Sequence, residues 1–187
     1  RAKALDSSKQ YMGGPQEALE AGKALANAGM ETKRILATME ETARAAAVFR
    51  SEMGDIANMD FDLQTKMGID PGQLKQVHNL LYYHSKGGRF EGQGLSKFAP
   101  VYLNELKQWG IGGVAGANFG GALLQSLQQV APATEPCETV TILKQGMSHL
   151  AAPRTRKQLM AMGIDVRKFA PGGKFRSVED LLALVEE

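Results

Sequence analysis

The amino-acid sequence predicts an all-α fold, a compact multi-helix bundle or orthogonal array of short helices. Alanine, leucine, methionine, glutamine and glutamate are plentiful, whereas the β-branched residues valine and isoleucine are scarce, which favours helix over strand. Apolar residues recur every three or four positions along most of the chain, and no run has the alternating pattern of a strand. Four of the periodic runs are followed by a glycine in the position of a helix stop.

The first predicted helix begins at Pro15, where proline is tolerated in the first turn, and places Leu19 and Leu25 on an alanine-rich face. The apolar stripe of the second run comprises Ile35, Met39, Ala43, Ala46, Phe49 and Met53. The third run repeats this spacing with Ile56, Met59, Leu63 and Met67. Asp70 is then the predicted N-cap, and Pro71 the first-turn proline, of a helix that carries Leu74, Val77 and Leu81.

Four further helices are predicted in the second half of the chain. The first carries Leu95, Phe98, Tyr102, Leu106 and Trp109. The second ends at Pro132 and carries Leu123, Leu127 and Val130. The third ends at Pro153 and carries Val140, Leu143, Met147 and Leu150. The last begins at Ser177, whose hydroxyl is placed to cap the amide of Asp180.

The sequence MGID occurs at 67–70 and again at 162–165. Its glycine pattern recurs after four helical runs, at Gly29, Gly68, Gly110 and Gly163. Glycine just past a helix end can adopt the left-handed conformation, and the apolar residue after it packs on the last turn. We therefore predict that these glycines are structural helix stops and not a ligand loop. Their spacing of roughly forty to fifty residues is compatible with stacked helical hairpins, the alternative architecture.

Two near-matching sequences, GGRF at 87–90 and GGKF at 172–175, predict turns that each bring a phenylalanine into the core. The length of 187 residues suits one domain or two small ones. We expect an irregular N-terminal segment at 1–14 and a helical domain at 15–187, with a sub-division near 132–136. Because the sequence starts at Arg1 and ends in a helical pattern, we expect a fragment of a longer protein.

Charge and cysteine content argue against several functional classes. The formal charge of +2 is too close to balance to predict specific nucleic-acid recognition or a membrane-surface partner. Cys137 is the only cysteine, and the three histidines do not have metal-ligand spacing. His78 and His84 lie on different helix faces, and His84 continues an apolar stripe, so we expect it to be partly buried and hydrogen-bonded. A nucleophile pair of Cys137 and His149 is left open by spacing alone.

The remaining motifs have structural explanations. GIGGVA at 110–115 matches a loose dinucleotide fingerprint, but it follows a helical run instead of a strand. The neighbouring acids Asp60 and Asp62, like Glu40 and Glu41, point apart on one helix, so we expect them on the solvated surface. A solvated cationic face is expected at the helix start that carries Arg154, Arg156 and Lys157, with an acidic partner or a phosphate as the alternative. We predict no catalytic residue, no cofactor-binding residue and no metal ligand.

Residues 108–134 form the only long stretch without charge. Within it, Gly112, Gly116 and Gly120 recur every four residues and would form a bare stripe on a helix, where two backbones can approach closely. Alternatively, Gly112 and Gly113 form the loop before this helix. Such stripes are common in membrane helices, but the glycines, Asn118 and several glutamines lower the hydropathy of this stretch. We predict a tightly packed helix inside a soluble domain, with Trp109 at least partly buried. A latent membrane helix is the alternative.

A succession of short sequences from about Gln16 to the end of the chain resembles the phage tail tape measure (minor tail) protein family. In order, these sequences are ALANAGM, EMGDIANM, KMGIDPGQL, GGRF, QWGIGG, ALLQSLQQ, AAPRTRKQLMAMGIDV and GGKFRSVEDLL. The resemblance implies a mostly helical segment of a protein that sets tail-tube length, is packed inside the tube and leaves at infection. It carries no catalytic residue onto any position of this chain.

The resemblance therefore implies a structural role in tail-length determination, tail tube assembly and DNA ejection, and not an enzyme. The implied partners are tail tube and tail assembly proteins, with self-association, and the implied locations are the inside of the virion tail tube and the host bacterial cytoplasm during assembly. One alternative is a membrane-active helical domain that uses residues 108–134 to help DNA cross the host envelope. A second alternative is a helical protein-interaction module unrelated to phage.

Overall fold

The computed structural model describes residues 14–87, 90–132, 134–165 and 174. Within these residues the regular secondary structure is entirely helical, which confirms the all-α prediction. The helices are α2 (Pro15–Asn27), α3 (Thr32–Phe49), α4 (Met53–Thr65), the 3-10 helix η1 (Pro71–Gln73), α5 (Leu74–Gly87), α6 (Gly92–Gln108), α7 (Gly113–Val130), α8 (Pro136–Ala151) and α9 (Pro153–Ala161). The predicted helix from Ser177 and the phenylalanine of GGKF lie outside the described residues.

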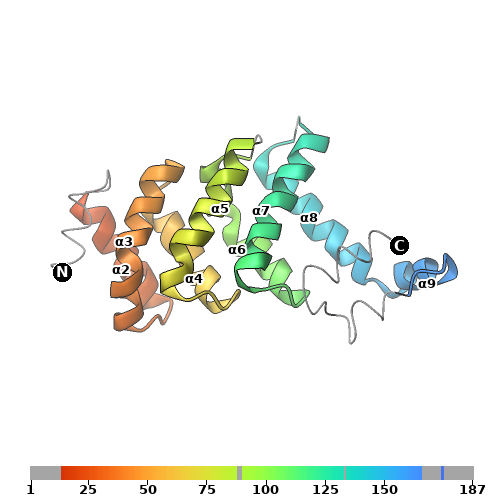
Figure 1. Ribbon diagram of the computed structural model, residues 1–187, viewed down its shortest axis with the longest axis horizontal. Coiled ribbons are helices and arrows are strands. Elements are labelled where there is room, and N and C mark those ends of the chain that lie inside the picture. The colour runs from red at the N-terminus through yellow and green to blue at the C-terminus, as the bar shows by residue number, and fades with distance from the viewer. Residues whose placement is uncertain (1–13, 88–89, 133, 166–173, 175–187) are drawn as a thin grey trace.

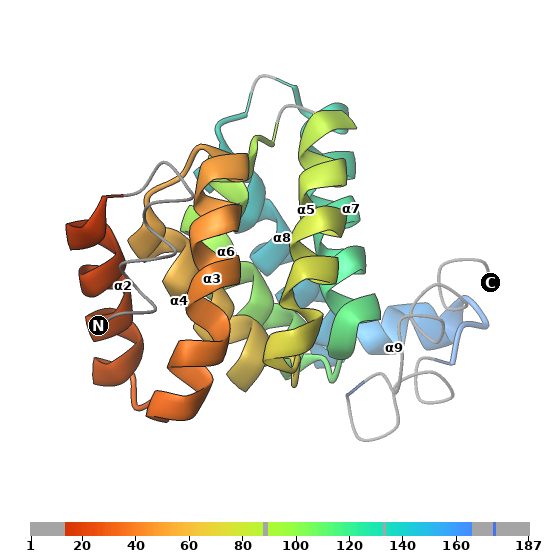
Figure 2. The same cartoon turned by 60° about the vertical axis from the view of Figure 1, so that its left-hand side comes forward.

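The helices form two rows that pack against each other (Figure 1). One row contains α2, α4, α6 and α8, and the other contains α3, α5 and α7, so each helix contacts the helix two places along the chain. Figure 2 shows α5 and α7 side by side in the second row, with α9 beyond α8 at one end. This compact packing has the order of stacked helical pairs, in which neighbouring pairs bury a continuous core.

Tight glycine turns connect the helices within the first three pairs. Gly29, Gly68 and Gly110 have φ values of 88°, 71° and 79°, and Gly163, which follows α9, has φ 93°. The residue after each glycine closes the turn onto the preceding helix: Ile69 N donates to Leu63 O at 3.1 Å, and Ile111 N donates to Leu106 O at 3.0 Å. Met30 and Ile164 make the same five-residue bond as Ile111, which is the pattern of a Schellman motif, whereas the bond of Ile69 spans six residues.

The three turns lie along one edge of the stack, the lower edge in Figure 1. The amide of Gly113 donates to Met67 O at 2.7 Å, which joins the third turn to the second. The first turn, 28–31, lines a shallow hollow together with Gln64 and Thr65 at the end of α4. Because successive turns are about forty residues apart and meet at one edge, the chain has a two-helix structural repeat.

Replacing Gly68 or Gly163 with valine should lower the free energy of unfolding by about 1 kcal/mol or more, because a β-branched residue is strained at positive φ. The matched control is Gly146→Ala in α8, where an added Cβ meets nothing within 4 Å. Alanine is favoured over glycine inside a helix by up to about 1 kcal/mol, so this control should be stabilised. Thermal melts check both expectations, and two neutral valine variants would show that the turns do not depend on glycine.

The core lies between the two rows. Among its largest fully buried side chains are Leu25, Met53, Ile56, Leu63, Leu81, Phe90, Leu95 and Tyr102. Two residues of the predicted stripes are instead exposed, Leu19 at 41% and Val130 at 86%. In α7 the buried face is made of glycines, Ala117, Leu124 and two glutamines, while Leu123 and Leu127 pack at its margin. Because the glycines of α7 face the neighbouring helices, the predicted leucine stripe lies at the edge of the buried face and not at its centre.

One helix boundary was not predicted. The stripe from Ile35 to Met53 predicts a single run, but α3 ends at Phe49 and α4 begins at Met53. Arg50 takes the left-handed conformation with φ 54°, and Ser51 N donates to Ala46 O at 3.1 Å. A non-glycine residue in this conformation costs roughly 1–2 kcal/mol. The turn buries both Phe49 and Met53, and this burial offsets the cost.

Candidate functional site

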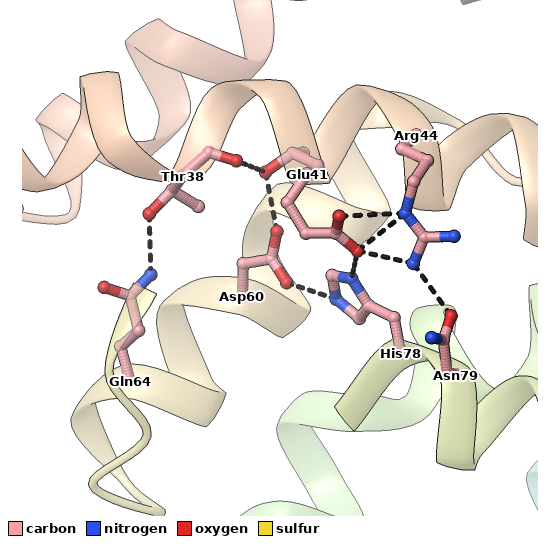
Figure 3. Close-up of polar contacts among 8 residues, drawn as sticks. Thr38, Glu41, Arg44, Asp60, Gln64, His78 and Asn79 are labelled. Atoms are coloured by element: carbon pink, nitrogen blue, oxygen red, sulfur yellow. Dashed lines mark hydrogen bonds and ion pairs between the residues drawn. The ribbon is translucent and has the colours of Figure 1, made fainter. Parts of the chain in front are cut away.

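A buried ionic cluster joins α3, α4 and α5 (Figure 3). His78 of α5 lies between two carboxylates, with Nδ1 2.8 Å from Glu41 Oε1 of α3 and Nε2 2.7 Å from Asp60 Oδ1 of α4. Asp60 is 0% exposed and His78 is 1% exposed, whereas Glu41 is partly buried. The Thr42 hydroxyl donates to the second oxygen of Asp60 at 2.6 Å. A single imidazole therefore holds three helices together.

The geometry makes His78 an imidazolium. Carboxylate oxygens only accept hydrogen bonds, so both ring nitrogens of His78 must donate, which requires a proton on each. Burial alone would lower the pKa of His78, but the charges and hydrogen bonds of Asp60 and Glu41 outweigh it and raise the pKa to about 9. Burial also works against ionisation of Glu41, yet its bonds to His78 and Arg44 lower the pKa of this carboxyl.

Arg44 completes the charge balance of the cluster. Its guanidinium binds both oxygens of Glu41, with Nε 2.8 Å from Oε2 and Nη2 2.6 Å from Oε1, and it also donates to Asn79 Oδ1 at 3.1 Å. Two carboxylates thus face two cations, and the cluster is neutral overall. A neutral, fully hydrogen-bonded set is the form in which buried charges are tolerated, and removal of one member leaves its partners uncompensated.

The cluster has the chemistry of a structural joint. Both nitrogens of His78 are occupied as donors, so no lone pair is available to bind a metal or accept a proton. Among the described residues, no group of three or more histidine, cysteine or acidic side chains has the arrangement of a metal site. Asp60 and His78 are closed to solvent, so a substrate does not reach them in this conformation.

The expectation that Asp60 and Asp62 lie on the solvated surface is wrong. Asp60 is buried in the cluster, and Asp62, 5% exposed, binds Lys66 Nζ at 2.9 Å. Glu40 is exposed as expected, whereas Glu41 is partly buried in the cluster. The sequence does carry a signal for Asp60, because it stands four residues after Ile56 and three before Leu63, on the apolar stripe itself. His78 lies on a stripe in the same way, four residues after Leu74 and three before Leu81.

The glycine-rich stretch forms the end of α6, the turn and α7. Gly112 is not part of the helical stripe, because it is the extended N-cap of α7 with φ −149°. Gly116 and Gly120 are buried on α7, and a Cβ added at Gly120 would lie 2.6 Å from Leu106 Cδ1 of α6. Gly121, which the four-residue spacing misses, faces α5, and its added Cβ would lie 2.9 Å from Leu81 Cδ2. These glycines allow α7 to approach two helices at once.

Buried glutamines explain why this uncharged helix is also rich in amides. Gln125 forms two hydrogen bonds with the backbone of Phe90, and Gln128 bonds to Thr134 O and to the Thr139 hydroxyl. The amides thereby satisfy polar groups in the segments before α6 and α8 that would otherwise be buried without partners. The polarity that lowers the hydropathy of 108–134 is therefore used to fasten neighbouring segments.

The other sequence candidates do not assemble into a site. Cys137 and His149 lie at opposite ends of α8, about 18 Å apart along the helix axis, so they do not form a nucleophile pair. His84 is partly buried and bonds Asn118 Oδ1 at 2.8 Å, as expected. GIGGVA follows α6 and opens α7, so the strand required by a dinucleotide fingerprint is absent there. Arg154 and Lys157 are exposed on α9, and Arg156 is partly buried.

The sequence profile of the family described as phage-related minor tail protein matches residues 1–187 of the chain. The chain belongs to the phage-related minor tail protein family. A search of curated proteins found no match, and neither did a search of solved structures. As a phage minor tail protein, the chain is a structural component of a phage tail and works among other tail proteins. The ionic cluster is thus a joint within a minor tail protein.

Proposed function

We propose that this chain is a folded segment of a phage tape measure protein, which acts in tail-length determination, tail tube assembly and DNA ejection. The family match over 1–187 and the all-helical fold of the described residues support this proposal. A tape measure can convert residue number into distance because an α-helix advances about 1.5 Å per residue. The proposal assigns no catalytic role and no cofactor, and it places the protein inside the virion tail tube after assembly in the host cytoplasm.

The ionic cluster supports an anchoring role for this segment. The longest described helices, α3 and α7, have 18 residues each, or about 27 Å, and the chain folds back after both. His78, Asp60 and Glu41 lock the folded-back arrangement of α3, α4 and α5. A segment locked in this folded-back arrangement would add little to the length of the ruler per residue. We infer that it anchors the ruler to tail tube and tail assembly proteins.

The proposal is tested in the phage that encodes the chain. An insertion of about 40 helix-forming residues in the same reading frame, outside 14–165, should lengthen the tail by about 60 Å in electron micrographs if the protein is a ruler. An unchanged tail length would overturn the tape measure function. Within the stack, His78→Ala should leave tails absent or irregular in length, whereas His149→Ala, at an exposed position, should leave them normal. Normal tails with His78→Ala would overturn the anchoring role.

The structure also bears on the membrane alternative. No helix among the described residues is long and apolar enough to cross a membrane. Trp109, at the start of the glycine-rich stretch, is 9% exposed, and Ile111 beside it is buried. We therefore expect that liposomes at neutral pH will not change the emission of Trp109. A blue shift with protection from aqueous quenchers would instead support a latent membrane helix, since Trp109 is the only tryptophan of the chain.

A further inference from the structure

The outer face of α5 and α7 presents an unusually exposed aromatic side chain. Tyr83 is 75% exposed, although it lies within α5 and not in a loop. The helix beneath it is fixed to its neighbours, because His84 bonds Asn118 of α7 and His78 is held in the ionic cluster. Exposed tyrosines on a rigid support are frequent centres of protein–protein interfaces.

Two hollows adjoin Tyr83 on this face. One, of about 620 Å³, extends toward the start of α5 and is lined by Lys75, Asn79 and Leu80. The other, of about 380 Å³, lies between α5 and α7 and is lined by Lys86, Ala122 and Ser126. Both hollows are wide and shallow, and Tyr83 lines both, so together they form one shallow depression along α5, which we call the groove. On α7 the second hollow is lined by the small side chains of Ala122 and Ser126 and by the longer amide side chains of Gln125 and Gln129.

The charge of the groove has one sign. Lys75 and Lys86 are exposed at its two ends, on the same side of α5 and about 16 Å apart along the axis. Neither α5 nor α7 contains an acidic residue. Arg44 reaches this face through Asn79, but Glu41 neutralises it, so the lysines carry the charge. The Lys86 ammonium lies 5.0 Å from the centre of the Tyr82 ring, which positions it.

We propose that this groove is a docking surface for an acidic helix of a partner protein. A helix laid along α5 would place carboxylates about 16 Å apart against Lys75 and Lys86, with small or apolar residues over Tyr83. The paired charges set orientation and partner choice, and the tyrosine supplies the central contact. The proposal concerns the groove alone and does not depend on a tape measure function.

The test uses the purified chain and a labelled helical peptide with glutamates about 16 Å apart and alanine or leucine between them. Binding is followed by fluorescence anisotropy at low salt. Lys75→Glu with Lys86→Glu should weaken binding at least about tenfold, and Tyr83→Ala should weaken it by about the same factor. A peptide with lysines in place of the glutamates should bind the doubly reversed variant and not the original chain.

The matched control reverses Lys97 and Lys107, an exposed lysine pair of similar spacing on α6 in the other row. This variant should bind the acidic peptide as the original chain does, and equal melting temperatures establish that all variants are folded. If the control loses as much affinity as Lys75→Glu with Lys86→Glu, the attraction is a general property of the surface and the groove is not a docking site. Absence of binding to the original chain overturns the proposal as well.

Discussion

Replacing His78 with alanine is expected to lower the free energy of unfolding by about 3–5 kcal/mol, because it leaves buried charges uncompensated. Asp60, 0% exposed, would keep only the Thr42 hydroxyl, and Glu41 would keep only Arg44 as its cation. The two carboxylates would also face each other across the space left by the imidazole. This is the largest effect that we expect from a single polar substitution in the described residues.

Chemical denaturation measures this loss, with His149→Ala at the exposed end of α8 as the matched control. The control should change the free energy of unfolding by no more than about 0.5 kcal/mol. Asp60→Asn should also destabilise the protein. The double variant Asp60→Asn with His78→Gln should lose less free energy of unfolding than the sum of the losses of Asp60→Asn alone and His78→Gln alone, since the two partners interact directly. Additive losses, or a neutral His78→Ala, would mean that the cluster does not join the helices.

The same cluster predicts a pH dependence. The folded-state pKa of His78, about 9, is above the ordinary value of 6.5, so the folded protein binds the proton more tightly than the unfolded chain. Its stabilising contribution is complete below pH 6.5 and is lost as the pH rises to about 9. Glu41 has a lowered pKa, so its contribution is present above its ordinary value of 4.5 and is lost in acid. The unfolding midpoint of the original chain should decrease as the pH rises from 6.5 to 9. The midpoint of His78→Gln should change little over the same range.

The second large effect is expected at Gly120. A Cβ at this position would lie 2.6 Å from Leu106 Cδ1, so Gly120→Leu has to separate α7 from α6 or force Leu106 out of place. Overpacking of this kind typically costs about 1–3 kcal/mol. Thermal melts of Gly120→Leu and of Gly146→Leu, where space is open, make the comparison. If Gly120→Leu is as stable as the original chain, the close approach of α7 to α6 is not required for folding.

Local rules predict part of this structure well. Glycine after a helical run predicted the turns at Gly68 and Gly110, because positive φ depends on the glycine itself and on its nearest neighbours. The turn at Arg50 has no such signal, since its left-handed conformation is imposed by the packing of α4 onto α3. The all-α fold is likewise local in origin, whereas the packing of the two rows depends on contacts between different helices, most of them neighbours or two places apart along the chain.

The ionic cluster shows the same division. Asp60 and His78 each stand on an apolar stripe, so their burial was predictable one residue at a time. Their pairing was not, because it requires knowing that α4 and α5 meet at α3. The rule that neighbouring acids on one helix point apart predicted Asp60 on the surface. It failed because the partner of Asp60, His78, lies on another helix. Gly121 was missed similarly, since its close neighbour Leu81 lies on α5.

The two-row order has a mechanical consequence. In a linear array each unit is held mainly by its neighbours, so an end unit can detach while the remainder stays folded. At one end α9 packs against α8, whereas toward the other end, which begins with α2, the helices α3, α4 and α5 are cross-linked by buried charge. The array should therefore open stepwise from the α9 end, and the cross-linked helices should yield last. A chain pulled from the α9 end would therefore unfold one helical pair at a time, without a single global unfolding event.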